Sequence, residues 1–334
     1  MALRLDRTYR RLARLVASLV VICAGLGGQP PAAHAAAACQ AVAFPVTIAG
    51  LPYHEAGTFC PGRAGMPLQV LVSGATYSSR YWDFPEAASY VQYAAGRGYA
   101  VLNLDRLGVG ASAKPAAELV TTHTQAEALH QVVQAVRAGQ LGGQAFPKVM
   151  TGGHSLGAGI ALLEAATYHD SDALLLEGFA HFFNLQGGQA LLAALIPAQN
   201  DTRLADRPPG YLTTAPGTRG ALFYDQAAAD PTVIRADEAT KETVTTGELS
   251  DFPEVVQSPQ LAGQITVPTL LLVGVGEPYF CENGCANVRQ EAGFWQPGLL
   301  STVVQQQSGH DVALQRNGLT AFGQIDAWLK QAGL

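Results

Sequence analysis

The sequence predicts an α/β fold in which a mostly parallel central sheet is flanked by helices. From residue 46 onward, short apolar runs bounded by glycine or turn residues alternate with amphipathic stretches of helical spacing. This alternation is typical of βαβ units, whose crossover helices place successive strands parallel. The chain of 334 residues is 48% hydrophobic and only 14% charged, which permits a large core and excludes a disordered or fibrous protein.

The apolar runs predict six buried strands, at residues 68–73, 100–105, 148–151, 173–177, 269–274 and 302–305. Helical spacing predicts helices at residues 86–95, 124–138, 156–168 and 318–330. Residues 46–48 and 54–59 are expected to form an antiparallel hairpin that opens the fold.

The first 35 residues predict a cleavable signal peptide. A cationic start with five arginines is followed by an apolar run at residues 15–26 and by the cleavage pattern Ala33-His34-Ala35. That run is shorter than the ~20 residues needed to cross a bilayer. We therefore expect a secreted, extracellular protein without a stable membrane span. The formal net charge of −6 leaves no basic surplus for a nucleic-acid partner.

Residues 179–259 interrupt the strand–helix rhythm. The segment contains an apolar, helix-like piece at 190–198, several proline and glycine turns, and a polar helical stretch at 236–247. It is too long for an ordinary connection and is expected to form a lid over the carboxyl edge of the sheet. The predicted organisation is a core at 36–178, a lid at 179–259 and a second part of the core at 260–334. A decorative insertion with no role at the site is the alternative.

Four cysteines remain after removal of the signal peptide, an even number that fits an oxidising compartment. Three pairings are possible, and short loop lengths favour Cys39–Cys60 and Cys281–Cys285. A Cys-x3-Cys pair can also bind a metal, but no further ligands lie nearby in the sequence to complete a site.

The motif Gly153-His154-Ser155-Leu156-Gly157 predicts a nucleophilic serine. It lies between a predicted strand and a helix rich in small residues, which is the context of a nucleophile elbow. Flanking glycines let strand and helix approach closely, so that the Ser155 hydroxyl is left exposed. The helix N-terminus favours developing negative charge beside it.

The serine needs a base that is oriented by an acid, in the chain order serine, acid, histidine. His310 follows the last predicted strand and is the candidate base. Glu277 follows the strand at 269–274 and is the favoured acid, because a carboxylate there can accept the His310 ring N–H. Glu177, at the end of the preceding strand, is the alternative acid.

The oxyanion hole is expected to use two backbone N–H groups. Leu156, which follows the nucleophile, supplies one. The loop after the strand at 68–73 supplies the other, with Ala75 as the candidate donor because Gly74 permits the turn. Side chains of Thr76 or Tyr77 are further candidate donors that could instead only pack against the lid.

These motifs resemble the α/β-hydrolase superfamily, and within it the secreted bacterial esterase and lipase-type members. The resemblance rests on residues 72–76, 105–112, 153–157, 274–278 and 309–311, which occur in order and at similar separations. Two positions depart from the pattern: Ser73 stands where the family often has His, and Glu277 stands where Asp is usual.

The resemblance implies an α/β-hydrolase fold with a helical lid after the sixth strand, and a serine hydrolase that cleaves small-molecule carboxylic esters without a metal or organic cofactor. A serine nucleophile argues against epoxide hydrolase and dehalogenase chemistry, and export argues against coenzyme A thioesters. An acyltransferase, or a thioesterase-like enzyme that processes lactones or polyketides, would use the same acyl-enzyme. A catalytically silent protein that binds a ligand or partner is the alternative from another class.

Overall fold

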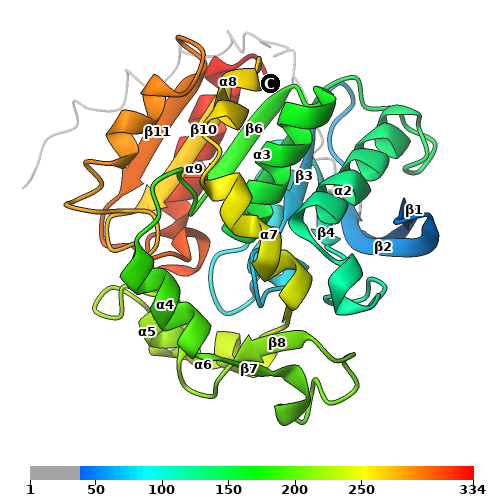
Figure 1. Cartoon of the computed structure of the whole chain (residues 1–334). Helices are drawn as coiled ribbons and strands as arrows, with labels where there is room; N and C mark the ends of the chain where they lie inside the picture. The colour runs from blue at the N-terminus through cyan, green and yellow to red at the C-terminus, as the bar shows by residue number, and fades with distance from the viewer. Residues whose placement is uncertain (1–37) are drawn as a thin grey trace, which may run out of the picture. The chain divides into compact units, whose positions relative to one another are not determined.

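An eight-stranded sheet with the order β1-β2-β4-β3-β5-β6-β10-β11 forms the centre of the computed structural model, which describes residues 38–334 (Figure 1). β1 and β2 form an antiparallel hairpin, and β2 also pairs antiparallel with β4. All the remaining pairings in this sheet are parallel. The strands are β1 (Gln40–Ile48), β2 (Leu51–Cys60), β3 (Leu68–Val72), β4 (Ala100–Asp105), β5 (Val149–His154), β6 (Ala173–Glu177), β10 (Thr269–Gly274) and β11 (Leu300–Gln305).

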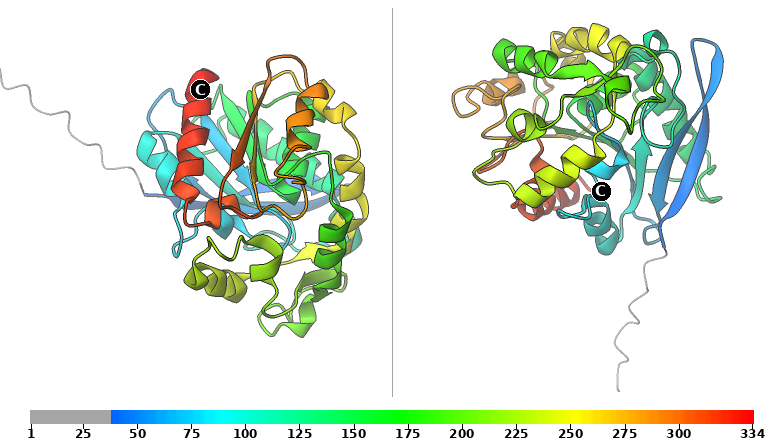
Figure 2. Two further views of the ribbon diagram at one scale, coloured as in Figure 1. Left: turned by 90° about the vertical axis from the view of Figure 1, so that its left-hand side faces the viewer. Right: turned by 90° about the horizontal axis from the view of Figure 1, so that it is seen from below.

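Helices cover both faces of this sheet. On one face α2 (Thr122–Arg137) packs against α3 (Leu156–Tyr168), and on the other α1 (Tyr90–Arg97) packs against α9 (Gly318–Gln331), as Figure 2 shows. The short helix α8 (Gln260–Gln264) contacts α3. Short 3₁₀ turns complete the connections: η1 (Ser79–Tyr81), η2 (Ala117–Leu119), η3 (Ala198–Asn200), η4 (Val288–Gly293) and η5 (Val312–Leu314). The α/β-hydrolase fold predicted from the sequence is confirmed.

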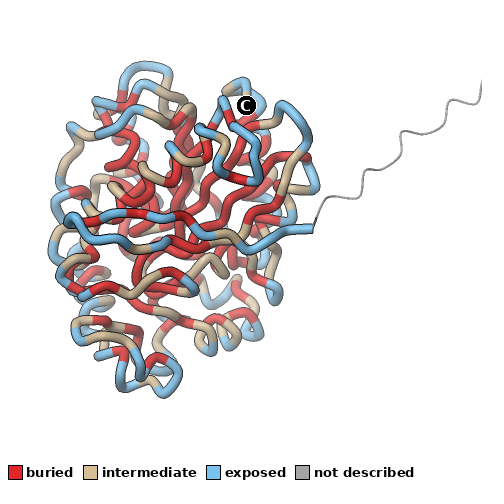
Figure 3. The backbone as a smooth tube through the Cα atoms, turned by 90° about the vertical axis from the view of Figure 1, so that its right-hand side faces the viewer, coloured by how far each residue is buried: buried red, intermediate tan, exposed pale blue. Residues whose placement is uncertain are grey.

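The core lies within and on both sides of the sheet. Every residue of β3, β4, β5, β6 and β10 is buried, as expected for parallel strands covered on both faces. Figure 3 shows these buried stretches running through the middle of the molecule, with exposed residues at its periphery. No helix among residues 38–334 is both long and apolar enough to cross a membrane.

Residues 179–259 form an insertion between β6 and β10; in Figure 1 its first part lies at the bottom of the picture, and its last helix runs up toward the middle. A small antiparallel sheet, β7 (Leu195–Pro197), β8 (Tyr211–Thr214) and β9 (Val244–Thr245), forms part of it. Its helices are α4 (Leu185–Ala193), α5 (Arg219–Phe223), α6 (Pro231–Thr240) and α7 (Thr246–Val256).

Local predictions within the insertion were partly wrong. The apolar piece at 190–198 is helical only to Ala193, because the residues of β7 pair with β8 instead. The polar stretch at 236–247 spans the end of α6, the strand β9 and the start of α7. A capping box of Thr245 and Glu248 starts the second helix there. In the core, the helix predicted at 86–95 begins at Tyr90, after the N-cap Ser89.

The part of the chain that the structure describes contains two disulfides, Cys39–Cys60 and Cys281–Cys285. The first joins the open end of the β1–β2 hairpin, and the second lies in the loop after β10. The predicted signal peptide at residues 1–35 lies outside the described residues.

Candidate active site

Ser155 stands at a sharp turn between β5 and α3, with φ +55° and ψ −119°. A β-carbon on Gly153 would lie 2.1 Å from the backbone of Gly157, and one on Gly157 would lie 2.6 Å from the carbonyl oxygen of Val72. Only glycine therefore fits at these two positions. The close approach holds the serine in a sparsely populated conformation of the kind that concentrates at active sites. Ser155 remains partly exposed, so a substrate can reach its side chain.

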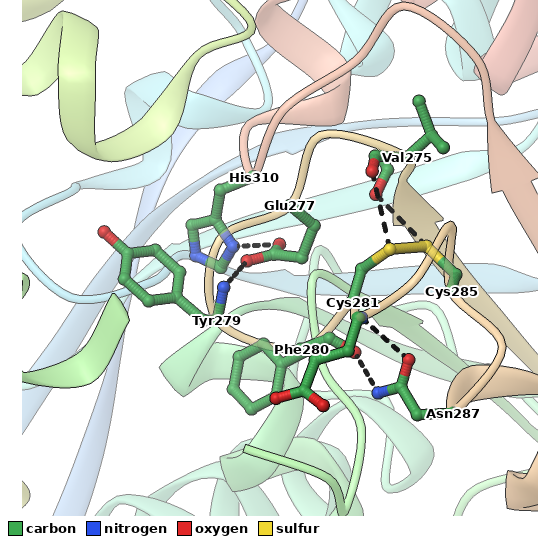
Figure 4. Close-up of a disulfide and its surroundings, with 10 residues drawn as sticks. Val275, Glu277, Tyr279, Phe280, Cys281, Cys285, Asn287 and His310 are labelled. Atoms are coloured by element: carbon green, nitrogen blue, oxygen red, sulfur yellow. Dashed lines mark hydrogen bonds and ion pairs between the residues drawn. A yellow bond between two sulfur atoms is a disulfide. The ribbon is translucent and has the colours of Figure 1, made fainter. Parts of the chain in front are cut away.

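His310 and Glu277 are joined by a hydrogen bond between Nδ1 and Oε2, and both side chains are buried (Figure 4). The other carboxylate oxygen of Glu277 accepts the backbone N–H of Tyr279 at 2.8 Å. Because Nδ1 donates to the carboxylate, the ring presents Nε2 as an acceptor, which is the tautomer that a general base needs.

The His310 ring lies next to the serine elbow. Its centroid is 4.7 Å from that of His154, which precedes Ser155. It also packs against Gly178, where a β-carbon would lie 3.1 Å from the ring. Among the described residues, no hydrogen bond joins the Ser155 hydroxyl to His310.

The alternative acid, Glu177, has other partners. Its carboxylate accepts hydrogen bonds from the Tyr81 hydroxyl and from the Ala313 N–H, and no hydrogen bond joins it to His310 within residues 38–334. Burial raises its pKa to about 7. Glu177 thus connects η1 to the segment that follows His310.

The loop after β3 passes close to Ser155. A β-carbon on Gly74 would lie 3.0 Å from Cβ of Ser155 and 2.7 Å from the His154 ring. Ala75 is partly exposed beside it, and Leu156 is the first residue of α3, where a helix leaves its N–H groups free. In residues 38–334 neither N–H donates to a protein acceptor. The use of these two N–H groups as oxyanion donors stays a prediction.

The insertion fixes this loop in place. Thr76 has φ +63°, and its backbone exchanges hydrogen bonds with the insertion, donating to the carbonyl oxygen of Thr243 at 3.2 Å and accepting from the N–H of Glu242 at 2.9 Å. Arg219 donates to the Thr76 hydroxyl at 2.9 Å. The Tyr77 hydroxyl bonds Asp237 and Asp311, so its donor already has protein acceptors.

Two buried arginines, which were not predicted from the sequence, hydrogen-bond the loop after β3 and pair with acidic residues of the insertion. Arg106 pairs with Glu248 of α7 at 2.5 Å and donates to the carbonyl oxygen of Gly74 at 3.2 Å. Arg219 pairs with Asp237 at 2.9 Å, and both side chains are buried. The sequence offered only one hint of these contacts, because Arg106 lies within the motif at 105–112. Its partner Glu248 lies 142 positions away along the chain, so no local pattern joins the two.

His154 and Asp311 form a second buried pair next to the triad candidates. Nε2 of His154 lies 3.3 Å from Oδ1 of Asp311, and the His154 ring stacks on Tyr81 at 4.0 Å. Burial, reinforced by His310, lowers the pKa of His154 well below its ordinary value. The neutral form of the His154 ring is therefore favoured.

The disulfide Cys281–Cys285 rests on the segment that carries Glu277. Its sulfur atoms lie 3.4 and 3.6 Å from the carbonyl oxygens of Val275 and Gly274 (Figure 4). Asn287 closes the same loop through a bond of 2.9 Å to the carbonyl oxygen of Phe280.

A separate hollow of about 750 Å³ opens at the surface beside α1 and the start of α9, with Tyr93, Gln315 and Leu319 in its wall. None of Ser155, Glu277 or His310 lines this hollow.

The sequence profile of the alpha/beta hydrolase family matches residues 69–321. The chain belongs to the alpha/beta hydrolase family. Similar solved structures of this fold include a thermophilic esterase from Thermogutta terrifontis, with 18% identity, a TM-score of 0.64, and coverage of 88% of this chain and 99% of that one. A monoglyceride lipase from Saccharomyces cerevisiae has 13% identity, a TM-score of 0.63, and coverage of 86% and 94%.

A putative aryl esterase from Burkholderia cenocepacia has 17% identity, a TM-score of 0.59, and coverage of 87% and 99%. At these low identities the similarities show the fold of the chain. No functionally curated protein matches the sequence.

Proposed function

We propose that this alpha/beta hydrolase is a secreted serine hydrolase of carboxylic esters that works through a Ser155–His310–Glu277 triad and an acyl-enzyme. The observation that carries the proposal is the Glu277–His310 hydrogen bond beside the strained serine turn. Two buried disulfide-bonded cysteines next to that pair support a protein that works in an oxidising environment.

In the proposed reaction, Ser155 Oγ attacks the acyl carbonyl while Nε2 of His310 takes its proton. Glu277 holds the ring by Nδ1 and stabilises the imidazolium. The N–H groups of Ala75 and Leu156 receive the oxyanion. His310 then protonates the leaving alcohol, and water, activated by the same histidine, releases the acid.

The insertion at 179–259 is proposed to cover the acyl site. Phe223 of α5 lies 5.9 Å from the His310 ring, and Tyr279 lies 4.7 Å from it, measured between ring centroids. Aromatic walls favour an apolar acyl group, because such a group is stabilised by leaving water. The substrate is thus proposed to be a small-molecule ester with an apolar acyl part.

The test is hydrolysis of p-nitrophenyl esters from acetate to palmitate by the purified protein. We expect turnover that Ser155→Ala and His310→Ala abolish while their circular dichroism spectra stay native. A fluorophosphonate should label the wild type at Ser155 and leave Ser155→Ala unlabelled.

Residual activity above about 1% in Ser155→Ala would remove this serine from the mechanism. Absence of both turnover and labelling in a folded protein would favour the binding role instead. Ester formation with added alcohols exceeding hydrolysis would favour the acyltransferase.

A further inference from the structure

A second cluster of ionisable side chains lies away from the proposed triad, where α2 and α3 pack together. It consists of His130 on α2, Glu164 on α3 and Asp170 in the turn before β6. Each residue offers one donor atom, and these atoms lie within 4.8 Å of one another. Glu164 is about 14 Å further along α3 than Ser155, so the cluster takes no part in acyl transfer.

Two carboxylate oxygens in this cluster lack donors among residues 38–334. Glu164 is fully buried; its Oε2 accepts from Ser171 at 3.3 Å, and its Oε1 has no partner within the described part of the chain. Asp170 Oδ2 accepts from His130 Nδ1 and from Gln134, each at 2.7 Å, while its Oδ1 is buried without a partner in the same residues.

Unpaired carboxylate oxygens that share a buried site repel each other and lose their hydration. A positive charge must therefore lie between them, either a shared proton or a metal cation. In the absence of metal, a proton shared by the two carboxyl groups takes this place. The neighbouring Arg137 does not fill it, since its guanidinium bonds the carbonyl oxygen of Asp170 and the carboxylate of Asp172.

We propose that His130, Glu164 and Asp170 bind a Zn²⁺ ion. One imidazole nitrogen with two carboxylate oxygens suits zinc, whereas Ca²⁺ and Mg²⁺ prefer six or more oxygen ligands. A water molecule would be the fourth ligand, and it can enter because the His130 and Asp170 side chains are 26% and 11% exposed. Zinc would displace the Glu164 proton to solvent and shift the His130 proton from Nδ1 to Nε2.

The ligands are held close to the arrangement that zinc requires. The His130 ring stacks on Tyr168 with centroids 3.8 Å apart, which fixes the ring plane. Arg137 holds the turn at Asp170 through its carbonyl oxygen. Ligand atoms on one tetrahedral zinc are about 3.4 Å apart, so small side-chain rotations close the site. The ion would then crosslink α2, α3 and the turn that leads into β6.

The test is a calorimetric titration of ZnCl₂ into the chelator-treated full-length protein at pH 7.5, together with thermal unfolding. We expect one zinc per chain at this site and a higher Tm with zinc. His130→Gln and Glu164→Gln should each lower the affinity at least tenfold and remove the rise in Tm. His123→Gln is the matched control, because this exposed histidine of α2 pairs with Asp251 outside the cluster.

A protein that binds no zinc at 1 mM contains only the proton-bridged carboxylates, which overturns the proposal. Equal zinc binding by the wild type and His130→Gln overturns it as well. Binding that His310→Ala removes would place the ion at the other cluster, His154–His310–Asp311, and overturn the assignment to His130. If Glu164→Gln fails to fold, the zinc titration of His130→Gln still tests the proposal, because His130 is partly exposed.

Discussion

Glu177 ends β6 and Glu277 follows the neighbouring strand β10, and of these two carboxylates only Glu277 is hydrogen-bonded to the His310 ring. Glu277→Gln keeps the shape of the side chain and removes the charge that stabilises the imidazolium. We expect kcat/KM for p-nitrophenyl butyrate to fall on the order of 10³-fold in this variant.

Glu177→Gln is the matched control, since this side chain bonds Tyr81 and Ala313 instead. Its kcat/KM should stay within about tenfold of the wild type. A larger loss at 177 than at 277 would transfer the role of the acid to the earlier strand.

Glu177 also predicts a pH dependence of stability. Its pKa is about 7 in the folded protein against 4.5 in the unfolded chain. The folded state therefore favours the neutral carboxyl, and this contribution is complete below pH 4.5 and is lost as the pH rises through 7.

Glu177→Gln removes this pH-dependent loss of stability, because glutamine does not ionise. We expect the stability of this variant relative to the wild type to increase by about 2 kcal/mol between pH 5 and pH 8. Urea unfolding of both proteins at the two pH values measures it, and a difference independent of pH would contradict the raised pKa.

Among the individual residues of the candidate site, Ser155, Glu277 and His310 could be predicted from the sequence, because each follows a recognisable strand. Arg106, Arg219 and Asp311 could not be assigned their contacts. Their partners lie far away along the chain, so no local pattern contains them. The bond between His310 and Glu277 was a prediction from position alone; its catalytic use remains for the variants to test.

Among the elements, the junction of β5 and α3 is very tightly packed. Gly157→Ala would place a β-carbon 2.6 Å from the carbonyl oxygen of Val72, which is backbone and cannot rotate away. We expect a loss of about 3 kcal/mol in the free energy of unfolding, measured in urea, because the strand and helix must separate.

Gly96→Ala is the control for that substitution. Gly96 is an exposed glycine of α1, and a β-carbon added there would meet no described atom within 4 Å outside its own helix. Alanine there should raise stability by up to about 1 kcal/mol through its higher helix propensity. Equal effects at the two positions would show that the close approach at the elbow has no energetic weight.

The elements of the core were predicted within a few residues, whereas those of the insertion were not. Strands such as Ala173–Glu177 are continuous apolar runs, and burial on both faces enforces that pattern. The residues of β7 are apolar, as are many residues of the preceding helix α4, so composition does not separate the strand from the helix. Only their pairing with β8, a contact between distant segments, decides that they form a strand.

At the scale of the whole molecule, removal of each disulfide is expected to affect stability and kcat differently. Cys39–Cys60 closes a longer loop than Cys281–Cys285 and lies far from the triad candidates in sequence. Replacing its cysteines by serine should cost about 3 kcal/mol of stability and leave kcat unchanged.

Replacing Cys281 and Cys285 by serine should cost less stability, about 2 kcal/mol, and lower kcat, because the loop that positions Glu277 loses its brace. Thermal unfolding and ester hydrolysis of the two double variants measure both effects. Equal kcat values would show that Glu277 is held without this disulfide.

The backbone pairing of Thr76 with Glu242 and Thr243 bears on what a domain exchange would do to this protein. A chimera that received another family member's insertion would lose the backbone partners of the loop after β3. Such an exchange should preserve that loop only if the segment at 242–243 is retained.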